Sequence, residues 1–266
     1  MVKERNMNEI ETLRAKLIPG YTPVWQLWIG SETPPQLACE KTVETVYNAA
    51  RGYQYMKLHW IDLPKFLRDL RARKRHKAQD SDVIRLWLLK TFGGVWLDSD
   101  IIARKDMEWR KLFEERPHQV FAGCHATKVR WASNGVLGTA LPENPVIVET
   151  YRLAMELFQT QTGKLGYTDA GPTLLTHVLQ QHPDAWTTLH CRDYGHPLTS
   201  NEFQKRYQRQ YQAPRDRETV YSSKDWYYAH VLGICLKKHQ NADLSTKDSI
   251  FCELLRATYH ELGLQL

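Results

Sequence analysis

The segment from Asp80 to Asp100, DSDVIRLWLLKTFGGVWLDSD, decides the fold of this 266-residue chain. Apolar residues recur at helical spacing as far as Phe92, and Gly93-Gly94 then ends the predicted helix. A short apolar strand follows at Val95-Trp96-Leu97 and leads directly into Asp98-Ser99-Asp100. This order of elements predicts two carboxylates in a loop at the carboxyl end of a strand.

Strand and helix patterns alternate through the remaining sequence, less regularly in its second half. Strands are predicted at residues 24–29, 54–61, 120–123 and 135–137. Helices are predicted at residues 1–17, 36–50, 80–92, 144–158, 172–179 and 245–262, with a helix or helix-loop at 65–77. We therefore expect an α/β fold with a mostly parallel central sheet flanked by helices, in a single domain over residues 1–266. Such sheets bind ligands at the carboxyl ends of their strands, where Asp98 and Asp100 would lie.

The pair Asp98 and Asp100 predicts a metal site. Like charges this close repel each other unless a cation lies between them, and fold stability does not require them here. Carboxylate oxygens are hard ligands that suit Mg²⁺ or Mn²⁺; the alternative is a solvated turn that caps the strand. On the preceding helix, Asp82 and Arg85 lie three residues apart and share a face, which suits a ligand contact or a surface ion pair.

The spacing from Asp82 to Asp100 resembles the signature of the DXD-motif sugar transferases. That family contains yeast outer-chain α-mannosyltransferases, bacterial capsule and lipopolysaccharide glycosyltransferases, and the catalytic domains of clostridial glucosylating toxins. Three further segments are similar to the family, in the expected order: Leu27-Trp28-Ile29-Gly30; Trp131-Ala132-Ser133-Asn134-Gly135 with Pro142-Glu143-Asn144-Pro145; and Ala170-Gly171-Pro172-Thr173-Leu174-Leu175-Thr176. The resemblance implies a GT-A-type nucleotide-sugar-binding fold and a glycosyltransferase that uses Mn²⁺ or Mg²⁺.

The resemblance also implies roles for individual residues. Asp98 and Asp100 would hold the metal ion, and Asp98 would also contact the donor ribose. Asp82 and Arg85 would bind the transferred sugar and the diphosphate side of the donor, because one only accepts and the other only donates hydrogen bonds. Trp28 would stack on the nucleotide base, with a core tryptophan as the alternative. The remaining expected contacts are Leu27, Ser99 and Asn134 for the donor, and Asp169 and Gly171 for the acceptor or sugar.

The chain departs from the family pattern near its C-terminus. Many members carry His followed by Ser-Trp, whereas Tyr228-Ala229-His230 is followed here by Val231-Leu232-Gly233. His230 is accordingly the predicted third metal ligand or a phosphate contact, with a structural histidine as the alternative. Family members retain the anomeric configuration of the sugar, but the sequence identifies neither a nucleophile nor a base for the acceptor hydroxyl.

The formal net charge of +6 comes from one segment. Residues Lys65–Lys77 carry seven Lys or Arg and one Asp, and the other residues hold 29 basic and 29 acidic side chains. This segment suits a solvated helix face, a peripheral contact with an anionic membrane, or an acidic acceptor. A second basic stretch, Lys205–Arg217, interleaves Arg with Tyr207 and Tyr211 and could also meet an acidic acceptor. We expect a nucleotide sugar and a glycan or lipid-linked glycan as partners.

The spacing of the cysteines and the hydropathy of the sequence indicate the cellular compartment. Five widely spaced cysteines form no CxxC pair, which favours a reduced compartment over a disulfide framework or a zinc site. No run approaches the roughly 20 apolar residues of a membrane span, and the N-terminus has no apolar signal core. We therefore expect a cytoplasmic protein, with the inner face of the membrane as a peripheral location.

The sequence predicts a metal-dependent retaining glycosyltransferase of bacterial capsule, lipopolysaccharide or O-antigen synthesis, with a UDP-linked donor favoured over a GDP-linked one. The alternatives are a transferase that acts on modified DNA or a protein, and a non-enzymatic nucleic-acid-binding protein. Nucleic acid is not the expected partner, because the excess charge is confined to one segment. Haloacid-dehalogenase-type phosphohydrolases also present Asp-x-Asp after a strand, but Ile101-Ile102-Ala103-Arg104 lacks the Thr or Val and the Gly that they need next.

Overall fold

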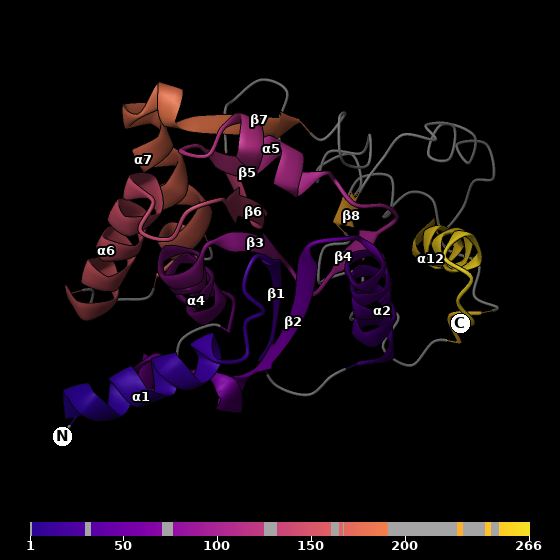
Figure 1. The fold of residues 1–266 in the computed structure, drawn as a ribbon, viewed down its shortest axis with the longest axis horizontal. Helices are drawn as coiled ribbons and strands as arrows, with labels where there is room; N and C mark the ends of the chain where they lie inside the picture. The colour runs from indigo at the N-terminus through magenta and orange to yellow at the C-terminus, as the bar shows by residue number, and fades with distance from the viewer. Residues whose placement is uncertain are drawn as a thin grey trace.

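The computed structural model describes residues 2–29, 33–70, 77–124, 132–160, 165–166, 168–190, 228–230, 243–245 and 250–266. Six strands form a central sheet in the order β2-β1-β3-β6-β5-β7, and β4 pairs with β8 in a second sheet (Figure 1). The strands are β1 Thr22–Trp28, β2 Tyr53–His59, β3 Gly94–Leu97, β4 Ile101–Ala103, β5 Val120–Cys124, β6 Ala132–Thr139, β7 Trp186–His190 and β8 Tyr228–His230. The longer helices are α1 Val2–Arg14, α2 Pro34–Ala49, α4 Lys77–Phe92, α5 Trp109–Glu115, α6 Pro145–Thr160, α7 Leu174–Gln181 and α12 Ile250–Glu261. The short turns are η1 Trp60–Asp62, α3 Lys65–Arg68, the π-helical η3 Asp169–Thr173 and η4 Pro183–Ala185.

The central sheet is mostly parallel, as predicted. Strand β1 runs parallel to both β2 and β3, and β5 runs parallel to β7. Strand β6 lies between β3 and β5 and is antiparallel to both. The start of β6 therefore lies at the same edge of the sheet as the carboxyl ends of β1 and β3, and it brings Asn134 to that edge.

Helices cover both faces of the sheet, and the alternation of side chains along each strand decides which residues meet which helices. Trp25 and Trp96 pack on one face, in a core with residues of α4, α6 and α7. Val95 and Leu97 pack on the other face, in a core with residues of α2 and α5. The alternation indicates that Asp98, two residues after Trp96, faces the side of the sheet on which α4 lies.

The glycine pair at the junction of α4 and β3 is required by the backbone conformation there. Gly93 and Gly94 have φ of +68° and +93°, in the left-handed region of backbone conformation that residues with a Cβ rarely adopt. A Cβ on Gly94 would also lie 2.3 Å from Pro23 O, because β3 passes close to the start of β1. Trp25 Nε1 donates to Gly93 O at 2.9 Å and ties the same turn to β1. These contacts fix the direction in which β3 delivers Asp98.

The observed elements agree with the prediction for the longer patterns and differ for the short ones. Helix α4 begins at Lys77 rather than residue 80, and β6 covers 132–139 rather than 135–137. Strands β4, β7 and β8 and helix α5 were not predicted, because elements of three to seven residues carry little periodicity. Within the basic segment, 65–68 is helical and α4 begins at 77, while 71–76 lie outside the described residues. Among the described helices, none combines the length and the apolar character needed to cross a bilayer.

Candidate active site

Asp98 lies where strand β3 ends, at the carboxyl edge of the central sheet. Its backbone is held from both neighbouring strands: Asp98 N donates to Gly135 O at 2.9 Å, and Asp98 O accepts from Gln26 Nε2 at 3.0 Å. Gln26 is fully buried in β1, and its Oε1 accepts from the hydroxyl of Tyr55 at 2.9 Å. The first carboxylate of the acidic pair is therefore anchored to the strands on each side of β3.

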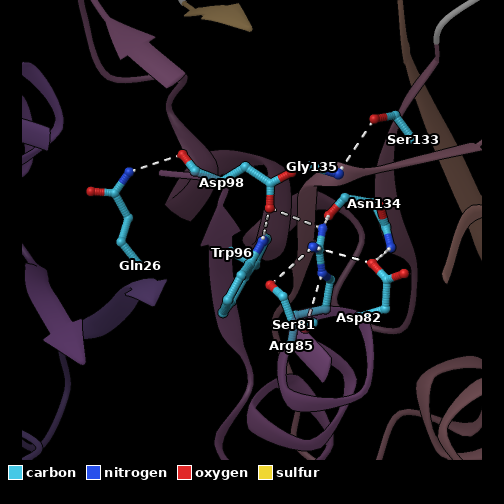
Figure 2. Close-up of polar contacts among 9 residues, drawn as sticks. All are labelled: Gln26, Ser81, Asp82, Arg85, Trp96, Asp98, Ser133, Asn134 and Gly135. Carbon is cyan, nitrogen blue, oxygen red and sulfur yellow. Dashed lines mark hydrogen bonds and ion pairs between the residues drawn. The ribbon is translucent and has the colours of Figure 1, made fainter. Parts of the chain in front are cut away.

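The side chain of Asp98 is held at one of its oxygens by a hydrogen bond and an ion pair. Trp96 Nε1 donates to Asp98 Oδ1 at 2.7 Å, and Arg85 Nη1 lies 3.0 Å from the same atom (Figure 2). The Asp98 side chain is 23% exposed, whereas that of Arg85 is 4% exposed. The carboxylate thus lies at the boundary between the buried network and the open edge of the sheet.

Arg85 joins Asp98 to the other two residues that the sequence placed in the donor site. Its Nη2 lies 3.2 Å from Asp82 Oδ1, and its Nη1 donates to the backbone oxygen of Asn134. Asn134 Nδ2 donates to the same Asp82 Oδ1 at 2.7 Å (Figure 2). Helix α4 and strands β3 and β6 therefore bring Asp82, Arg85, Asp98 and Asn134 into one network. The surface ion pair considered for Asp82 and Arg85 is not what the fold builds, because both residues are buried.

Burial has an electrostatic consequence for Asp82. It raises the pKa of the Asp82 carboxyl from its ordinary value of 3.8 to about 7, against the charge of Arg85 and the hydrogen bond from Asn134, which lower the pKa. The charge of Asp98 adds to the increase. Asp82 and Asp98 thus share the guanidinium of Arg85, and burial disfavours the ionisation of Asp82.

The π-helical turn η3 closes over Asp82. A Cβ on Gly171 would lie 2.3 Å from Asn134 Nδ2 and 2.4 Å from Asp82 Cγ, so glycine is needed for this close approach. The other expected acceptor residue, Asp169, accepts from Gly166 N at 2.7 Å and thereby holds its own loop. Of this predicted pair, Gly171 is therefore brought into contact with the network, and Asp169 stands beside it in the same turn.

The second carboxylate of the pair leaves the strand in a turn. Ser99 and Asp100 lie between β3 and β4, and Ile101 N closes the turn by donating to Asp98 O at 3.1 Å. Strand β4 then pairs with β8, and the register places His230 opposite Ile101, next in sequence to Asp100. The side chain of His230 lies outside the described part of the structure. Among the side chains that are described, no group of three or more His, Cys, Asp or Glu could hold a metal ion.

Trp28 and Leu27 lie at the end of β1 and are both buried. The ring of Trp28 faces Lys57, with Nζ 5.3 Å from the ring centroid, and its Nε1 is buried without a hydrogen-bond partner. Leu27 packs in the core on the α4 side of the sheet. Neither side chain belongs to the network around Arg85, so the expected contacts with the nucleotide base stay predictions.

Two residues of the network were missed in the sequence. Trp96 was read as part of an apolar strand, and Gln26 was not singled out. The available signal for Trp96 was its position two residues before Asp98, which puts both side chains on one face. For Gln26 it was an amide inside the otherwise apolar strand TPVWQLW, because a buried amide must find hydrogen-bond partners.

A protein-family model described as "Capsular polysaccharide synthesis protein" matches residues 2–169, which is more than half of the chain. The chain belongs to this family. Membership confirms the predicted kinship with sugar transferases and the prediction of an enzyme, a glycosyltransferase. The matched region of the chain includes the whole Asp82–Asp100 motif and Asn134, and it ends at Asp169, before Gly171 and His230. No curated protein sequence matches the chain.

Solved structures agree with the predicted GT-A-type fold. The apo form of the glycosyltransferase GlyE of Streptococcus pneumoniae TIGR4 has a TM-score of 0.53 and 11% identity to this chain. That match covers 91% of this chain and 62% of GlyE. Other similar structures are the PaToxG glycosyltransferase (TM-score 0.48, 17% identity, 68% of this chain and 79% of that one) and a glycosyltransferase involved in the glycosylation of the major capsid of PBCV-1 (TM-score 0.48, 12% identity, 89% of this chain and 99% of that one). At 11% identity, the similarity to GlyE identifies the fold alone.

Proposed function

We propose that this glycosyltransferase moves a sugar from a nucleotide-sugar donor to a glycan acceptor in bacterial surface-polysaccharide synthesis, with retention of configuration and with a divalent cation. A UDP-linked donor is favoured over a GDP-linked one. The observation that carries the proposal is the position of Asp98, whose side chain joins the buried network and is 23% exposed at the carboxyl edge of the sheet. Ligands of sheets of this kind bind at that edge.

The residues at this edge fit a divalent cation. Asp98 and Asp100 are hard oxygen ligands two residues apart, and a cation would offset their mutual repulsion. They would hold Mn²⁺ or Mg²⁺, with His230 as the proposed third ligand because its backbone lies opposite Ile101. When bound, such an ion supplies positive charge to the diphosphate leaving group.

The chain's own residues would then position the donor. Asp82 would accept a hydroxyl of the transferred sugar, and Asn134, which donates to Asp82, would lie at the same point. Gly171 lies against both of these residues, so the acceptor would approach from the side of η3, where Asp169 also lies. Trp28, Leu27 and Ser99 would contact the nucleoside, since the first two end β1 and Ser99 follows β3 at the same edge of the sheet.

The basic segment would serve the acceptor. We propose that Lys65–Lys77 holds the enzyme against an anionic membrane surface that carries the lipid-linked glycan. In the described part of this segment, Lys65 pairs with Asp69 at 2.7 Å and Arg68 pairs with Glu9 at 3.4 Å. The charge that remains for an anionic partner therefore resides mostly in residues 71–77, which directly precede or begin α4.

The proposal is tested with Asp100→Ala and a matched Asp184→Ala variant. Asp184 is exposed in η4, away from the acidic pair. Thermal shift with UDP- and GDP-sugars plus Mn²⁺ should stabilise the wild type and Asp184→Ala, by about 2.7 kcal/mol at 100 times Kd. Asp100→Ala should keep its fold, lose this stabilisation and lose Mn²⁺-dependent hydrolysis of the donor. Full activity of Asp100→Ala would refute the proposal.

A further inference from the structure

Gln26 is an amide side chain inside a buried strand. Every residue of β1 from Pro23 to Trp28 is buried, and Gln26 itself is 0% exposed. A buried amide has to find hydrogen-bond partners, whereas an apolar side chain of the same size would need none. The partners of Gln26 come from the strands on either side: Oε1 accepts from the Tyr55 hydroxyl at 2.9 Å, and Nε2 donates to Asp98 O at 3.0 Å (Figure 2). The amide therefore joins β2 to the end of β3.

The oxygen that accepts from Gln26 belongs to the first peptide unit of the acidic turn, which is Asp98-Ser99-Asp100. Asp98 O also accepts from Ile101 N at 3.1 Å, and this bond closes the turn. The carbonyl is thus paired without Gln26, and the second donor adds a constraint on its direction. Because the peptide unit is planar, the direction of this carbonyl sets the path of the chain toward Asp100.

Tyr55 determines which end of the amide faces Asp98. A Gln side chain presents an acceptor oxygen at one end and an NH₂ donor at the other. The Tyr55 hydroxyl donates to the oxygen, and the Nε2 donor is thereby directed toward Asp98 O. Tyr55 lies in β2, Gln26 in β1 and Asp98 at the end of β3, and these strands are neighbours in the sheet. A row of two hydrogen bonds therefore crosses three strands and ends on the backbone of the acidic turn.

We propose that Gln26 and Tyr55 are positioning residues of the metal site. Tyr55 orients the amide of Gln26, and Gln26 sets the position of the Asp100 carboxylate relative to that of Asp98. The inference rests on the proposed function, which assigns these two carboxylates to the divalent cation. Partners outside the ligands themselves commonly tune metal affinity in this way. Loss of either residue should therefore weaken metal binding, while nucleotide binding without metal is preserved.

The test uses Gln26→Met, Tyr55→Phe and the double variant, with Trp25→Phe as the matched control. Gln26→Met keeps the length of the side chain and removes both hydrogen bonds, and Tyr55→Phe removes the hydroxyl alone. Trp25 is the buried neighbour of Gln26 in β1, and its Nε1 donates to Gly93 O at 2.9 Å, just before the start of β3. Its replacement removes a hydrogen bond to the same part of the chain, away from the acidic turn.

Four measurements are made on each variant. Mn²⁺ affinity is measured by electron paramagnetic resonance, and UDP affinity is measured by calorimetry in EDTA. Circular dichroism checks the fold, and urea denaturation gives the stability. Comparison of the single and double variants shows whether the two residues act on Mn²⁺ through one path, because residues in one hydrogen-bond network are not additive.

We expect Gln26→Met to weaken Mn²⁺ binding about tenfold, as loss of an outer partner does at metal sites. Tyr55→Phe should weaken it by less, and the double variant should match Gln26→Met, because Tyr55 acts through Gln26. UDP affinity in EDTA should equal that of the wild type in every variant. Trp25→Phe should bind Mn²⁺ like the wild type even where its stability is lower.

Three results would overturn the inference. They are an unchanged Mn²⁺ affinity in Gln26→Met, an equal loss of Mn²⁺ affinity in Trp25→Phe, and a loss in the double variant that is the product of the two single losses. If Gln26→Met does not fold, Tyr55→Phe decides, and an unchanged Mn²⁺ affinity there would overturn the inference. A wild type that binds neither Mn²⁺ nor UDP would instead refute the proposed function.

Discussion

Asn134 Nδ2 donates to Asp82 Oδ1 across 2.7 Å and thereby joins the first residues of β6 to the first turns of α4. Both residues are buried, and Arg85 contacts each of them. This contact connects the helix that supplies Asp82 and Arg85 to the strand beside Asp98. The stability of the fold and the geometry of the site therefore depend on the same hydrogen bonds.

The burial of Asp82 predicts that its ionisation destabilises the fold. Its pKa is raised to about 7 in the native state against 3.8 for an ordinary Asp, so between about pH 4 and 7 the native state binds more protons than the unfolded state. The contribution of Asp82 to the free energy of unfolding should then fall as the pH rises through this window, by up to about 1.4 kcal/mol per pH unit, and level off above pH 7.

The Asp82→Asn variant removes this titration. Its free energy of unfolding, measured by urea denaturation at pH 5, 6, 7 and 8, should rise relative to that of the wild type from pH 5 to 7 and level off toward pH 8. The exposed control Asp184→Asn should instead run parallel to the wild type. Parallel curves for Asp82→Asn and wild type would show that Asp82 is ionised throughout.

Gly171 predicts a purely steric effect. A Cβ there would lie 2.3 Å from Asn134 Nδ2 and 2.4 Å from Asp82 Cγ, and both neighbours are buried. Gly171→Ala should therefore cost about 1–3 kcal/mol of stability and also lower kcat for donor hydrolysis, because the network itself must shift. Gly20→Ala is the control: Gly20 has φ of +81° with no atom within 4 Å of its Cβ position, so it should lose stability without losing activity. Equal activity in the two variants would contradict this reading.

A buried hydroxyl cluster is predicted to anchor β8. The Tyr228 hydroxyl contacts the Tyr47 hydroxyl and accepts from Trp109 Nε1 at 2.7 Å, which holds β8 against α2 and α5. Tyr228→Phe should lose about 1 kcal/mol of stability and also weaken Mn²⁺ binding, since β8 carries His230. Tyr259→Phe removes a buried hydroxyl that donates to Ala38 O in α2 and should change stability alone. If Tyr228→Phe kept the Mn²⁺ affinity of the wild type, β8 would not contribute to the metal site and the prediction would be wrong.

The basic segment predicts salt-sensitive binding to anionic vesicles. Replacing Arg71, Arg73, Lys74 and Arg75 by Gln removes four charges at about 1 kcal/mol each, so binding to phosphatidylserine vesicles at low salt should fall more than a hundredfold. The control replaces Lys205, Arg206, Arg209 and Arg215 by Gln, which changes the net charge equally from the second basic stretch. Equal loss in both variants would show that net charge, and not this segment, binds the membrane.

The parts of the fold that the sequence predicted are those with long, regular patterns. The helix before Gly93-Gly94, the strand after it and the mostly parallel sheet follow from periodicity and from two glycines that end a helix. Strands β4 and β8 have three residues each and exist because they pair with one another across more than a hundred residues of sequence. Local patterns hold no information on such a pairing.

By itself, the sequence determined that two carboxylates end a buried strand and that an Asp and an Arg share one face of the preceding helix, because glycine turns and residue spacing are local properties. Only the tertiary structure decided what Arg85 does. Packing of α4 against β3 and β6 surrounds its guanidinium with Asp82, Asp98, Asn134 and Trp96, which come from three separate elements. A surface arginine would face solvent, whereas this buried one lies among acceptors that the protein itself supplies. The same burial that hides Arg85 thus leaves Asp98 as the residue of this network at the open edge of the sheet.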